Sequence, residues 1–323
     1  MNTQLLDGAA GIEQAAALLA AGQVVALPTE TVYGLAGHAL NAEAAARIFE
    51  AKERPFFDPL IVHLPSLDWL GRLTLAADDV LVRRLIEAFW PGPLTLVLPR
   101  RAVVPDIVTS GLATVAVRIS AHPLFRAVLG RFGQPVAAPS ANRFGRISPT
   151  AAEHVFEELN GRIPLILDGG PCAVGVESTV VAVREGALEI LRAGPVTAEE
   201  LGAYGEVVFP RAGSGIEGPG QMQSHYAPGT SLRLLSRIGE SDSWQGEGRA
   251  GLLAWSRAER PAQFAAMEVL TPRGDSREAA ARLFAAMRRL DGLGLDVIVA
   301  EPPPGGGLGA AIGDRLRKAA GGR

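Results

Sequence analysis

Hydrophobic and polar positions along residues 1–210 follow two different periods. An amphipathic stretch at 11–21 predicts a helix that ends at Gly22. A second predicted helix starts at Asn41, a favourable N-cap residue, and stops before Pro55. Short apolar runs predict strands at 23–28, 59–64, 94–99, 114–119, 135–140, 163–168, 178–183 and 188–194, with more helices around 78–89, 122–132 and 150–160. The pattern predicts a mixed α/β domain.

The pattern changes at residues 211–230, where glycine and proline dominate and no period survives, as in a linker or long loop. Beyond it, strands are predicted at 231–235, 250–255, 267–271 and 295–300, and helices at 275–291 and 310–320. Strands that alternate with helices favour a small three-layer α/β domain with a mainly parallel sheet. The chain is thus expected to hold a domain at 1–210, a linker at 211–230 and a second domain at 231–323.

Length and composition agree with two packed domains. The chain has 323 residues, of which 48% are hydrophobic and 20% charged, which is typical of a folded protein and not of a disordered one. The formal charge of −3 provides no global basic field for nucleic acid, although a local basic groove stays possible.

Cysteine and histidine usage limits the chemistry further. The single cysteine, Cys172, excludes an internal disulfide and a cysteine-based zinc site, and it fits a reducing cytoplasm. The N-terminal apolar stretch IEQAAALLAAG is too short to span a bilayer, so we expect a cytoplasmic protein. The five histidines show no metal-ligand spacing, so no metal site is predicted.

Three glycine-rich segments are candidates for phosphate loops. Residues 213–218 match G-x-G-x-x-G, but Pro219 follows and no helix opens to receive a pyrophosphate. Residues 170–179 lack the lysine of a Walker A loop, yet their backbone amides are suited to approach an anion. The turn at 305–309 lies between a strand and a helix, where either nucleotide binding or simple helix capping explains its glycines, with capping slightly favoured.

Lysine is rare in this chain, which draws attention to Lys52. Only Lys52 and Lys318 stand among 31 basic residues, the rest being arginine. A lysine is a compact point charge on a flexible stem, whereas arginine is a planar fork, so the two are not interchangeable at a binding site. By residue type alone a solvated helix-end lysine is the more common case.

Six segments together form a recognisable series. They are PTETVYGL (28–35), KERPFFDPLIVH (52–63), WPGPLTLVL (90–98), TVAVRIS (114–120), APSANRFGRISPT (138–150) and DGGPCAVGVESTVV (169–181). In this order and spacing they resemble the YrdC-type threonylcarbamoyl-AMP synthases. The segments HYAPGT (225–230) and GLGAAIGDRLRKAA (307–320) resemble the C-terminal domain of the longer, two-domain form of that family. The resemblance covers essentially the whole chain.

The resemblance implies a fold and a reaction. The first domain is expected to be a twisted mixed sheet with a concave cavity, and the second to be Rossmann-like, with the linker at 211–230 over the active site. The reaction implied is that of a nucleotidyltransferase, which converts L-threonine, bicarbonate and ATP into threonylcarbamoyl-AMP and pyrophosphate. A tRNA threonylcarbamoyl transferase complex then uses the product to modify adenosine 37 of tRNA.

The resemblance also implies roles for individual residues. Negative charge builds on phosphate oxygens in this chemistry, so fixed cations and amide donors matter more than a nucleophile. Lys52 and Arg54 are the implied catalytic residues, facing the triphosphate, which gives the rare lysine a function. The residues implied to bind L-threonine are Thr31, His63, Arg118, Ser140 and Ser178.

A further set is implied to contact ATP. Asp58 is the unusual member, because some relatives carry Asn there and an aspartate beside phosphates needs a metal or Arg54 to neutralise it. Mg²⁺ is expected with ATP, held mostly by phosphates and water because no protein cage is visible. The implied ATP contacts are Arg54, Asp58, Thr114, Asn142, Ser148, Arg192 and Tyr226. Thr114 and Ser178 could also be ordinary strand residues.

Two other functions stay open at this point. A non-catalytic double-stranded RNA-binding module would use the same cavity for a nucleic-acid backbone, but acidic residues outnumber basic ones within 1–210. A relative that makes carbamoyl-adenylate from carbamoyl phosphate, as in hydrogenase maturation, carries a zinc-finger segment, for which one cysteine is insufficient.

Overall fold

The computed structural model describes residues 2–210, 218, 225–257 and 259–321. It divides into two compact units. Unit 1 comprises Met1–Phe144, Pro149–Ala173 and Glu177–Gln221, and unit 2 comprises Gly145–Ser148, Val174–Val176 and Met222–Arg323. Most of the linker predicted at 211–230 lies outside the described residues. No helix in the described part of the chain is long and apolar enough to cross a membrane.

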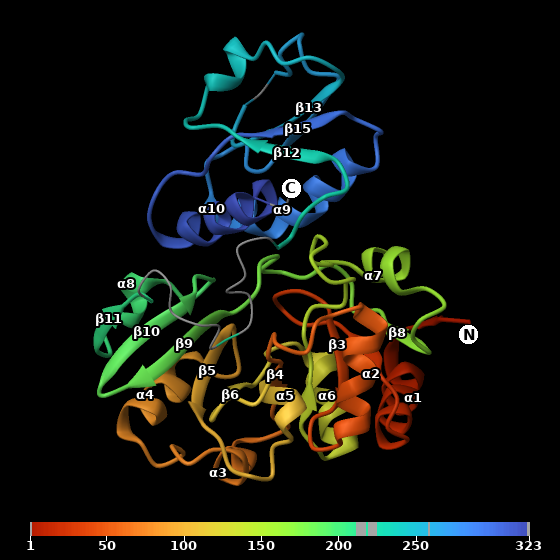
Figure 1. The fold of residues 1–323 in the computed structure, drawn as a ribbon, viewed down its shortest axis with the longest axis vertical. Coiled ribbons are helices and arrows are strands. Elements are labelled where there is room, and N and C mark those ends of the chain that lie inside the picture. The colour runs from red at the N-terminus through yellow and green to blue at the C-terminus, as the bar shows by residue number, and fades with distance from the viewer. Residues whose placement is uncertain (1, 211–217, 219–224, 258, 322–323) are drawn as a thin grey trace. The chain divides into compact units, whose positions relative to one another are not determined.

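Unit 1 is built on one mixed sheet (Figure 1), with the strand order β1-β8-β2-β3-β7-β4-β6-β5-β9-β10-β11. Parallel pairs such as β4–β6 and β5–β9 alternate with antiparallel pairs such as β5–β6 and β9–β10. Its strands are β1 (Gln4–Leu6), β2 (Val25–Leu27), β3 (Gly34–His38), β4 (Ile61–His63), β5 (Leu94–Pro99), β6 (Thr114–Arg118), β7 (Val136–Ala137), β8 (Leu165–Leu167), β9 (Thr179–Arg184), β10 (Ala187–Arg192) and β11 (Glu206–Val208).

The helices of unit 1 bury apolar faces against this sheet. α1 packs on α6, with both against β2, β7 and β8, while α2 packs on β3 in a second, larger cluster. The helices are α1 (Gly8–Ala20), α2 (Ala42–Lys52), α3 (Leu70–Leu73), α4 (Val80–Phe89), α5 (Asp106–Thr109), α6 (Pro123–Phe132), α7 (Ala152–Leu159) and α8 (Ala198–Leu201), with a 3-10 turn η1 (Leu67–Trp69).

A third apolar cluster of unit 1 consists of strand residues near the middle of the sheet. β4, β5, β6 and β10 each contribute one residue, and β9 contributes two. Its members are Ile61, Val97, Ala116, Val180, Ala182 and Leu191. Gly218 packs on it, since a Cβ at Gly218 would lie 3.1 Å from Leu191 Cδ1 and 3.4 Å from Val180 Cγ1. The cluster therefore forms an apolar floor beside the strand ends that carry His63, Arg118 and Arg192.

Unit 2 contains a four-stranded parallel sheet with the order β12-β15-β13-β14. Its elements are β12 (Ser231–Leu234), η2 (Glu240–Ser243), β13 (Ala250–Ala254), β14 (Ala266–Val269), α9 (Ser276–Asp291), β15 (Val297–Ala300) and α10 (Gly307–Ala320). α9 and α10 pack together and contact the strands (Figure 1). Alternate strand residues such as Leu252 and Val299 pack instead with Phe264 and Trp244.

A buried glutamate closes the carboxyl edge of this second sheet. Glu301 follows β15 and is 1% exposed. Its Oε1 accepts hydrogen bonds from Ser241 Oγ at 2.7 Å and Gly239 N at 3.2 Å, and its Oε2 accepts one from Trp255 N at 2.9 Å. In parallel α/β sheets ligands usually bind at this edge. Here the three donors bind the carboxylate of Glu301 instead.

The turn at 305–309 has a steric reason for its glycines. Gly306 and Gly307 adopt positive φ angles of 85° and 48°. A Cβ on Gly309 would lie 2.2 Å from the carbonyl oxygen of Pro304, so the start of α10 packs too closely on the preceding loop for any side chain. These observations account for the glycines by backbone geometry, in line with the capping interpretation.

Candidate active site

The end of α2 places Lys52 in the interior of unit 1. Asn41 caps the start of the helix, its Oδ1 accepting hydrogen bonds from two backbone N–H groups of the first turn at 2.9 and 3.1 Å. The helix ends because Glu53 takes a left-handed conformation, with φ 53°. Lys52 is 1% exposed, and its Nζ donates to the backbone carbonyls of Ser140 and Asn142, each at 2.5 Å.

The charge of Lys52 is costly in this position. Burial lowers the pKa of Lys52 well below its ordinary value of 10.5, and the nearby charge of Arg54 lowers it further, against the opposing effects of Asp58 and Glu158. Carbonyl dipoles solvate the ammonium group only in part. A bound anion would restore the charged form, because an opposite charge within a few ångströms favours it.

Arg54 holds the loop that follows α2. Its Nη2 lies 2.8 Å from Asp58 Oδ2, and the guanidinium also donates to the backbone carbonyls of Asp58 and Pro59 at 3.1–3.3 Å. Burial raises the pKa of Asp58, while Arg54, Lys52 and Arg192 oppose that rise. Apart from the ion pair, neither carboxylate oxygen of Asp58 has a hydrogen-bond donor among the described residues.

Arg192 brings a third buried cation to this region from the end of β10. Its Nε donates to Ser178 O at 3.0 Å and its Nη2 to Ser178 Oγ at 3.1 Å. The Ser178 hydroxyl also pairs with Thr95 Oγ1 at 2.8 Å. Ser178, predicted to bind threonine, thus lies on Arg192, which is predicted to bind ATP. We call Lys52, Arg54, Asp58 and Arg192 the phosphate end.

A second polar region lies on β4 and β6, whose parallel pairing sets His63 beside Arg118. The His63 ring packs on Phe125 with 4.8 Å between centroids. Burial and then the charge of Arg118 lower the pKa of His63 to about 3, so the ring is neutral at ordinary pH. Its Nδ1 has no hydrogen-bond partner within the described chain.

Arg118 is anchored on three sides. Its Nε donates to Gly92 O at 3.0 Å, its Nη1 to Thr31 Oγ1 at 3.1 Å, and its Nη2 lies 2.6 Å from Glu30 Oε1. The side chain of Arg118 is 3% exposed and that of Glu30 is 12% exposed. Arg118, which is predicted to bind the threonine carboxylate, is therefore already paired with the carboxylate of Glu30. We call Glu30, Thr31, His63 and Arg118 the amino-acid end.

Glu30 is the residue that sequence reasoning missed. Its Oε2 accepts a hydrogen bond from Ser120 Oγ at 2.5 Å, and its Oε1 accepts one from Ala121 N at 3.1 Å. Burial raises the pKa of Glu30, but the charge of Arg118 and these hydrogen bonds outweigh burial and bring the pKa to about 2. The available signal was its place beside Thr31, as the only charged residue in PTETVYGL.

The remaining predicted residues of unit 1 are placed as follows. Ser140 is partly buried and contributes its carbonyl to Lys52, while Asn142 is 1% exposed and donates from Nδ2 to Arg143 O at 2.7 Å. Thr114 starts β6 and Arg118 ends it. The two lie on one face but about 13 Å apart along the strand.

Ser148 and Tyr226 belong to unit 2. Ser148 is fully buried. Tyr226 has a left-handed backbone with φ 64°, and its ring is 1% exposed. Within unit 2 the ring packs on Phe284, with 5.6 Å between centroids, and below Arg315 Cζ at 5.2 Å.

Comparison with known proteins gives matches along nearly the whole chain. Residues 17–194 match the Sua5_yciO_yrdC family, described as telomere recombination, and residues 196–321 match the C-terminal domain of threonylcarbamoyl-AMP synthase. The chain is 42% identical to threonylcarbamoyl-AMP synthase of Bacillus subtilis, over 97% of this chain and 93% of the relative. The chain belongs to the threonylcarbamoyl-AMP synthase family.

Further comparisons, with one sequence and one solved structure, match the same family. The synthase of Pyrococcus abyssi is 40% identical, over 96% of this chain and 94% of its own. The crystal structure of P. abyssi Sua5 complexed with L-threonine superimposes with a TM-score of 0.88 at 35% identity, covering 100% of this chain and 98% of that chain. The family resemblance, the two-part α/β fold and the enzyme class predicted from the motifs are confirmed.

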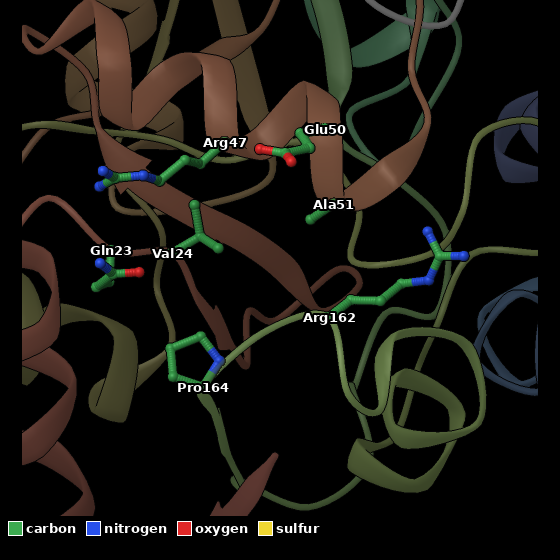
Figure 2. A pocket seen from close by; sticks show the side chains of 7 residues that line it. All are labelled: Gln23, Val24, Arg47, Glu50, Ala51, Arg162 and Pro164. Carbon is green, nitrogen blue, oxygen red and sulfur yellow. The ribbon is translucent and has the colours of Figure 1, made fainter. Parts of the chain in front are cut away.

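A separate pocket lies behind α2 (Figure 2), with a volume of about 360 Å³. Its apolar floor is flanked by Arg47 and Arg162, but Arg47 donates to Gly22 O and Arg162 pairs with Glu53 at 2.8 Å. It contains none of the residues that the synthase motifs supply. Among the described residues no cluster of three or more His, Cys, Asp or Glu side chains is arranged to hold a metal ion.

Proposed function

We propose that this chain is an L-threonylcarbamoyladenylate synthase. It converts L-threonine, bicarbonate and ATP into threonylcarbamoyl-AMP, pyrophosphate and water. The observation that carries the proposal is the phosphate end, where the charges of Lys52, Arg54 and Arg192 act together on the buried carboxylate of Asp58, in a chain that named synthases match along its length. A gathering of buried basic groups is typical of a site for a polyanion.

The chemistry needs few reactive side chains. The threonine amine, as the free base, attacks the carbon of bicarbonate, so that an N–C bond forms while a C–O bond breaks, and the amine proton leaves with that oxygen as water. An oxygen of the resulting carbamate then attacks the α-phosphorus of ATP, the bond from that phosphorus to the bridging oxygen of the β-phosphate breaks, and pyrophosphate leaves. Charge grows on phosphate oxygens, where Lys52 and Arg54 act electrostatically. With pKa values of about 2 and 3, Glu30 and His63 are too weakly basic to hold the amine proton at neutral pH, so the amino-acid end orients the substrate.

The residue roles follow from the two ends. In the proposal, Lys52 and Arg54 are catalytic, and L-threonine contacts Arg118 through its carboxylate, with Thr31, His63, Ser140 and Ser178 around it. ATP contacts Arg54, Asp58, Thr114, Asn142, Ser148, Arg192 and Tyr226. In this proposal Tyr226 comes from the linker at 211–230, and the second domain spans 231–323.

Mg²⁺ enters as part of the ATP substrate. It prefers one or two carboxylates together with phosphates and water, and Asp58 supplies a buried carboxylate at the phosphate end. The oxygens of Asp58 have few donors, which fits a metal-bound phosphate as neighbour. The product passes to a tRNA threonylcarbamoyl transferase complex for adenosine 37 of tRNA, in the cytoplasm expected from the single cysteine.

Pyrophosphate release from ATP and bicarbonate, with and without L-threonine, tests this function. Release that requires L-threonine, with threonylcarbamoyl-AMP found by mass spectrometry, supports it. Release without L-threonine points to an ATPase or another acceptor. No release, together with double-stranded RNA binding that weakens steeply as salt is raised, would favour the RNA-binding alternative.

A further inference from the structure

The roles predicted for the threonine-site residues do not explain why the carboxylate of Glu30 is paired with Arg118. The 2.6 Å contact joins two side chains that are 12% and 3% exposed. A site that needed only a cation for a substrate carboxylate would bind it better without a resident carboxylate beside that cation. Burying the carboxylate of Glu30 beside Arg118 costs free energy, and we look for the compensating interaction in the bound ligand.

Arg118 keeps donors for a ligand despite this pair. A guanidinium has five N–H groups. Three are directed at Gly92 O, Thr31 Oγ1 and Glu30 Oε1, which leaves two for a ligand within the described part of the chain. Glu30 thus fixes the plane of the guanidinium without exhausting it, and a carboxylate can still be bound.

The charges at the amino-acid end add up to zero. Arg118 and Glu30 cancel, and His63 is neutral because its pKa lies near 3. The neighbouring His122 also favours its neutral form, since burial lowers its pKa against the opposing charge of Glu30. The hydroxyls of Thr29, Thr31 and Ser120 carry no charge.

A charge-neutral dipolar site suits a charge-neutral dipolar ligand. A free α-amino acid presents a carboxylate and an ammonium group on one carbon, so it can face a guanidinium and a carboxylate together. An anion of similar shape that lacks the ammonium group meets the resident carboxylate with no compensation. Specificity of this kind comes from a repulsive element as much as from an attractive one.

We infer that Glu30 is a specificity-determining residue, which makes the threonine site select the amino-acid zwitterion over related anions by setting its carboxylate against the guanidinium of Arg118. The inference rests on the proposed function. It concerns recognition of the ammonium group, while the predicted residues concern the carboxylate and hydroxyl groups.

Glu30→Gln isolates the charge, because the amide fits the same contacts. Its oxygen can take the place of Oε1, which accepts from Ala121 N and lies 2.6 Å from Arg118 Nη2. Its nitrogen can take the place of Oε2, since the Ser120 hydroxyl is able to accept a hydrogen bond as well as donate one. The variant then changes the net charge of the site from zero to +1.

The measurement is the binding of L-threonine and of its hydroxy-acid analogue, in which a hydroxyl replaces the ammonium group, by calorimetry on the full-length protein. The unmodified protein is expected to prefer L-threonine. In Glu30→Gln that preference should fall about tenfold or more, as for loss of one charged hydrogen-bonding partner. A merely structural role would weaken both ligands together and leave their ratio unchanged, which would overturn the inference.

Controls separate the possible failures. Glu13→Gln removes a matched glutamate from an exposed pair with Arg131, and it should change neither affinity. If Glu30→Gln does not fold, as judged by its melting transition, Glu30→Asp keeps the charge and should keep the preference for L-threonine; loss of the preference in that variant would contradict the inference. Failure of the unmodified protein to bind L-threonine would overturn the proposed function itself.

Discussion

The phosphate end and the amino-acid end both contain buried arginines, but they balance charge differently. At the phosphate end the charges of Lys52, Arg54 and Arg192 act together on the carboxylate of Asp58. At the amino-acid end Arg118 pairs with Glu30. The residues named at the first end are mostly basic, and those named at the second end pair one base with one acid. The ligands proposed for the two ends differ in the same way, since one is a polyanion and the other a zwitterion.

This difference separates a buried cation in an ion pair from one that is held by backbone carbonyls. A paired charge such as Arg118 is compatible with the empty protein, because its carboxylate is present whether or not substrate is bound. The charged form of Lys52 is disfavoured by burial until an anion binds nearby. The phosphate end is thus expected to lower the stability of the free protein and to gain most from ligand binding.

The largest effect is expected at Lys52. Lys52→Ala should reduce turnover by about two to four orders of magnitude, because a fixed charge on the phosphates is lost. The protein should remain folded, since the loss of two hydrogen bonds to carbonyls is opposed by relief of a buried charge. The measurement is steady-state pyrophosphate release together with a melting curve.

The chain offers a matched control for that variant. Lys318 is the other lysine, and it pairs with Asp314 at 2.9 Å within α10 of unit 2. Lys318→Ala should leave turnover near the unmodified rate. An equal loss of turnover in both variants, or no loss in Lys52→Ala, would contradict the role of Lys52 at the phosphate end.

Asp58→Asn should shift the phosphate end further toward positive charge. Because burial raises the pKa of Asp58 above its ordinary 3.8, the folded state binds more protons than the unfolded state as the pH rises above that ordinary value. Stability is therefore lost as the pH rises from the ordinary pKa toward the raised one.

The expected result for Asp58→Asn is an unchanged or higher free energy of unfolding at pH 7, from urea titration. The Michaelis constant for ATP with Mg²⁺ should rise by about threefold to tenfold, because the carboxylate beside the metal-bound phosphate is lost. A fall in that constant would show that Asp58 repels the phosphates and would contradict its proposed contact with ATP.

His63 tests whether the amino-acid end stays neutral. Its pKa is about 3 in the folded state and 6.5 ordinarily, so only the unfolded chain gains a proton between these values. The free energy of unfolding should fall as the pH is lowered through this window, and in His63→Gln the fall from pH 7 to pH 4 should be smaller by about 3 kcal/mol. Urea titrations at both pH values measure this, and equal slopes in the two proteins would contradict a neutral buried ring.

The smallest effect is expected at Ser178, which touches Arg192 at the phosphate end. Ser178→Ala removes one hydrogen bond to Arg192 and one to Thr95, at a cost of about 1 kcal/mol each. If Ser178 serves mainly to orient Arg192, the Michaelis constant for ATP should rise more than that for L-threonine. The reverse ranking would return Ser178 to the amino-acid end, where the motifs place it.

Helices and long strands were predictable from sequence because each carries a full period of apolar residues. The helix that begins at Asn41 and the strand at 94–99 are found at α2 and β5. Strand β3 was missed, since its sequence GLAGH looks like a loop. Gly37 is there because a Cβ would lie 3.1 Å from Ala44 O and from Ile48 Cδ1 of α2, a long-range contact that no local pattern reveals.

The candidate site was predictable only where residue type and motif coincide. Lys52 stood out through the rarity of lysine, and the structure adds that its Nζ is held by backbone carbonyls 88 and 90 residues away. Glu30 escaped notice because its partners Arg118 and Ser120 are about 90 residues distant in the chain. An ion pair across that separation depends on how β6 is placed in the sheet.

Glu301 in unit 2 has a consequence for anion binding at that sheet edge. Its carboxylate is tethered to the three donors it occupies, so it competes with any free anion at the effective concentration of an intramolecular group. A phosphate of moderate affinity in solution therefore meets donors that are already occupied.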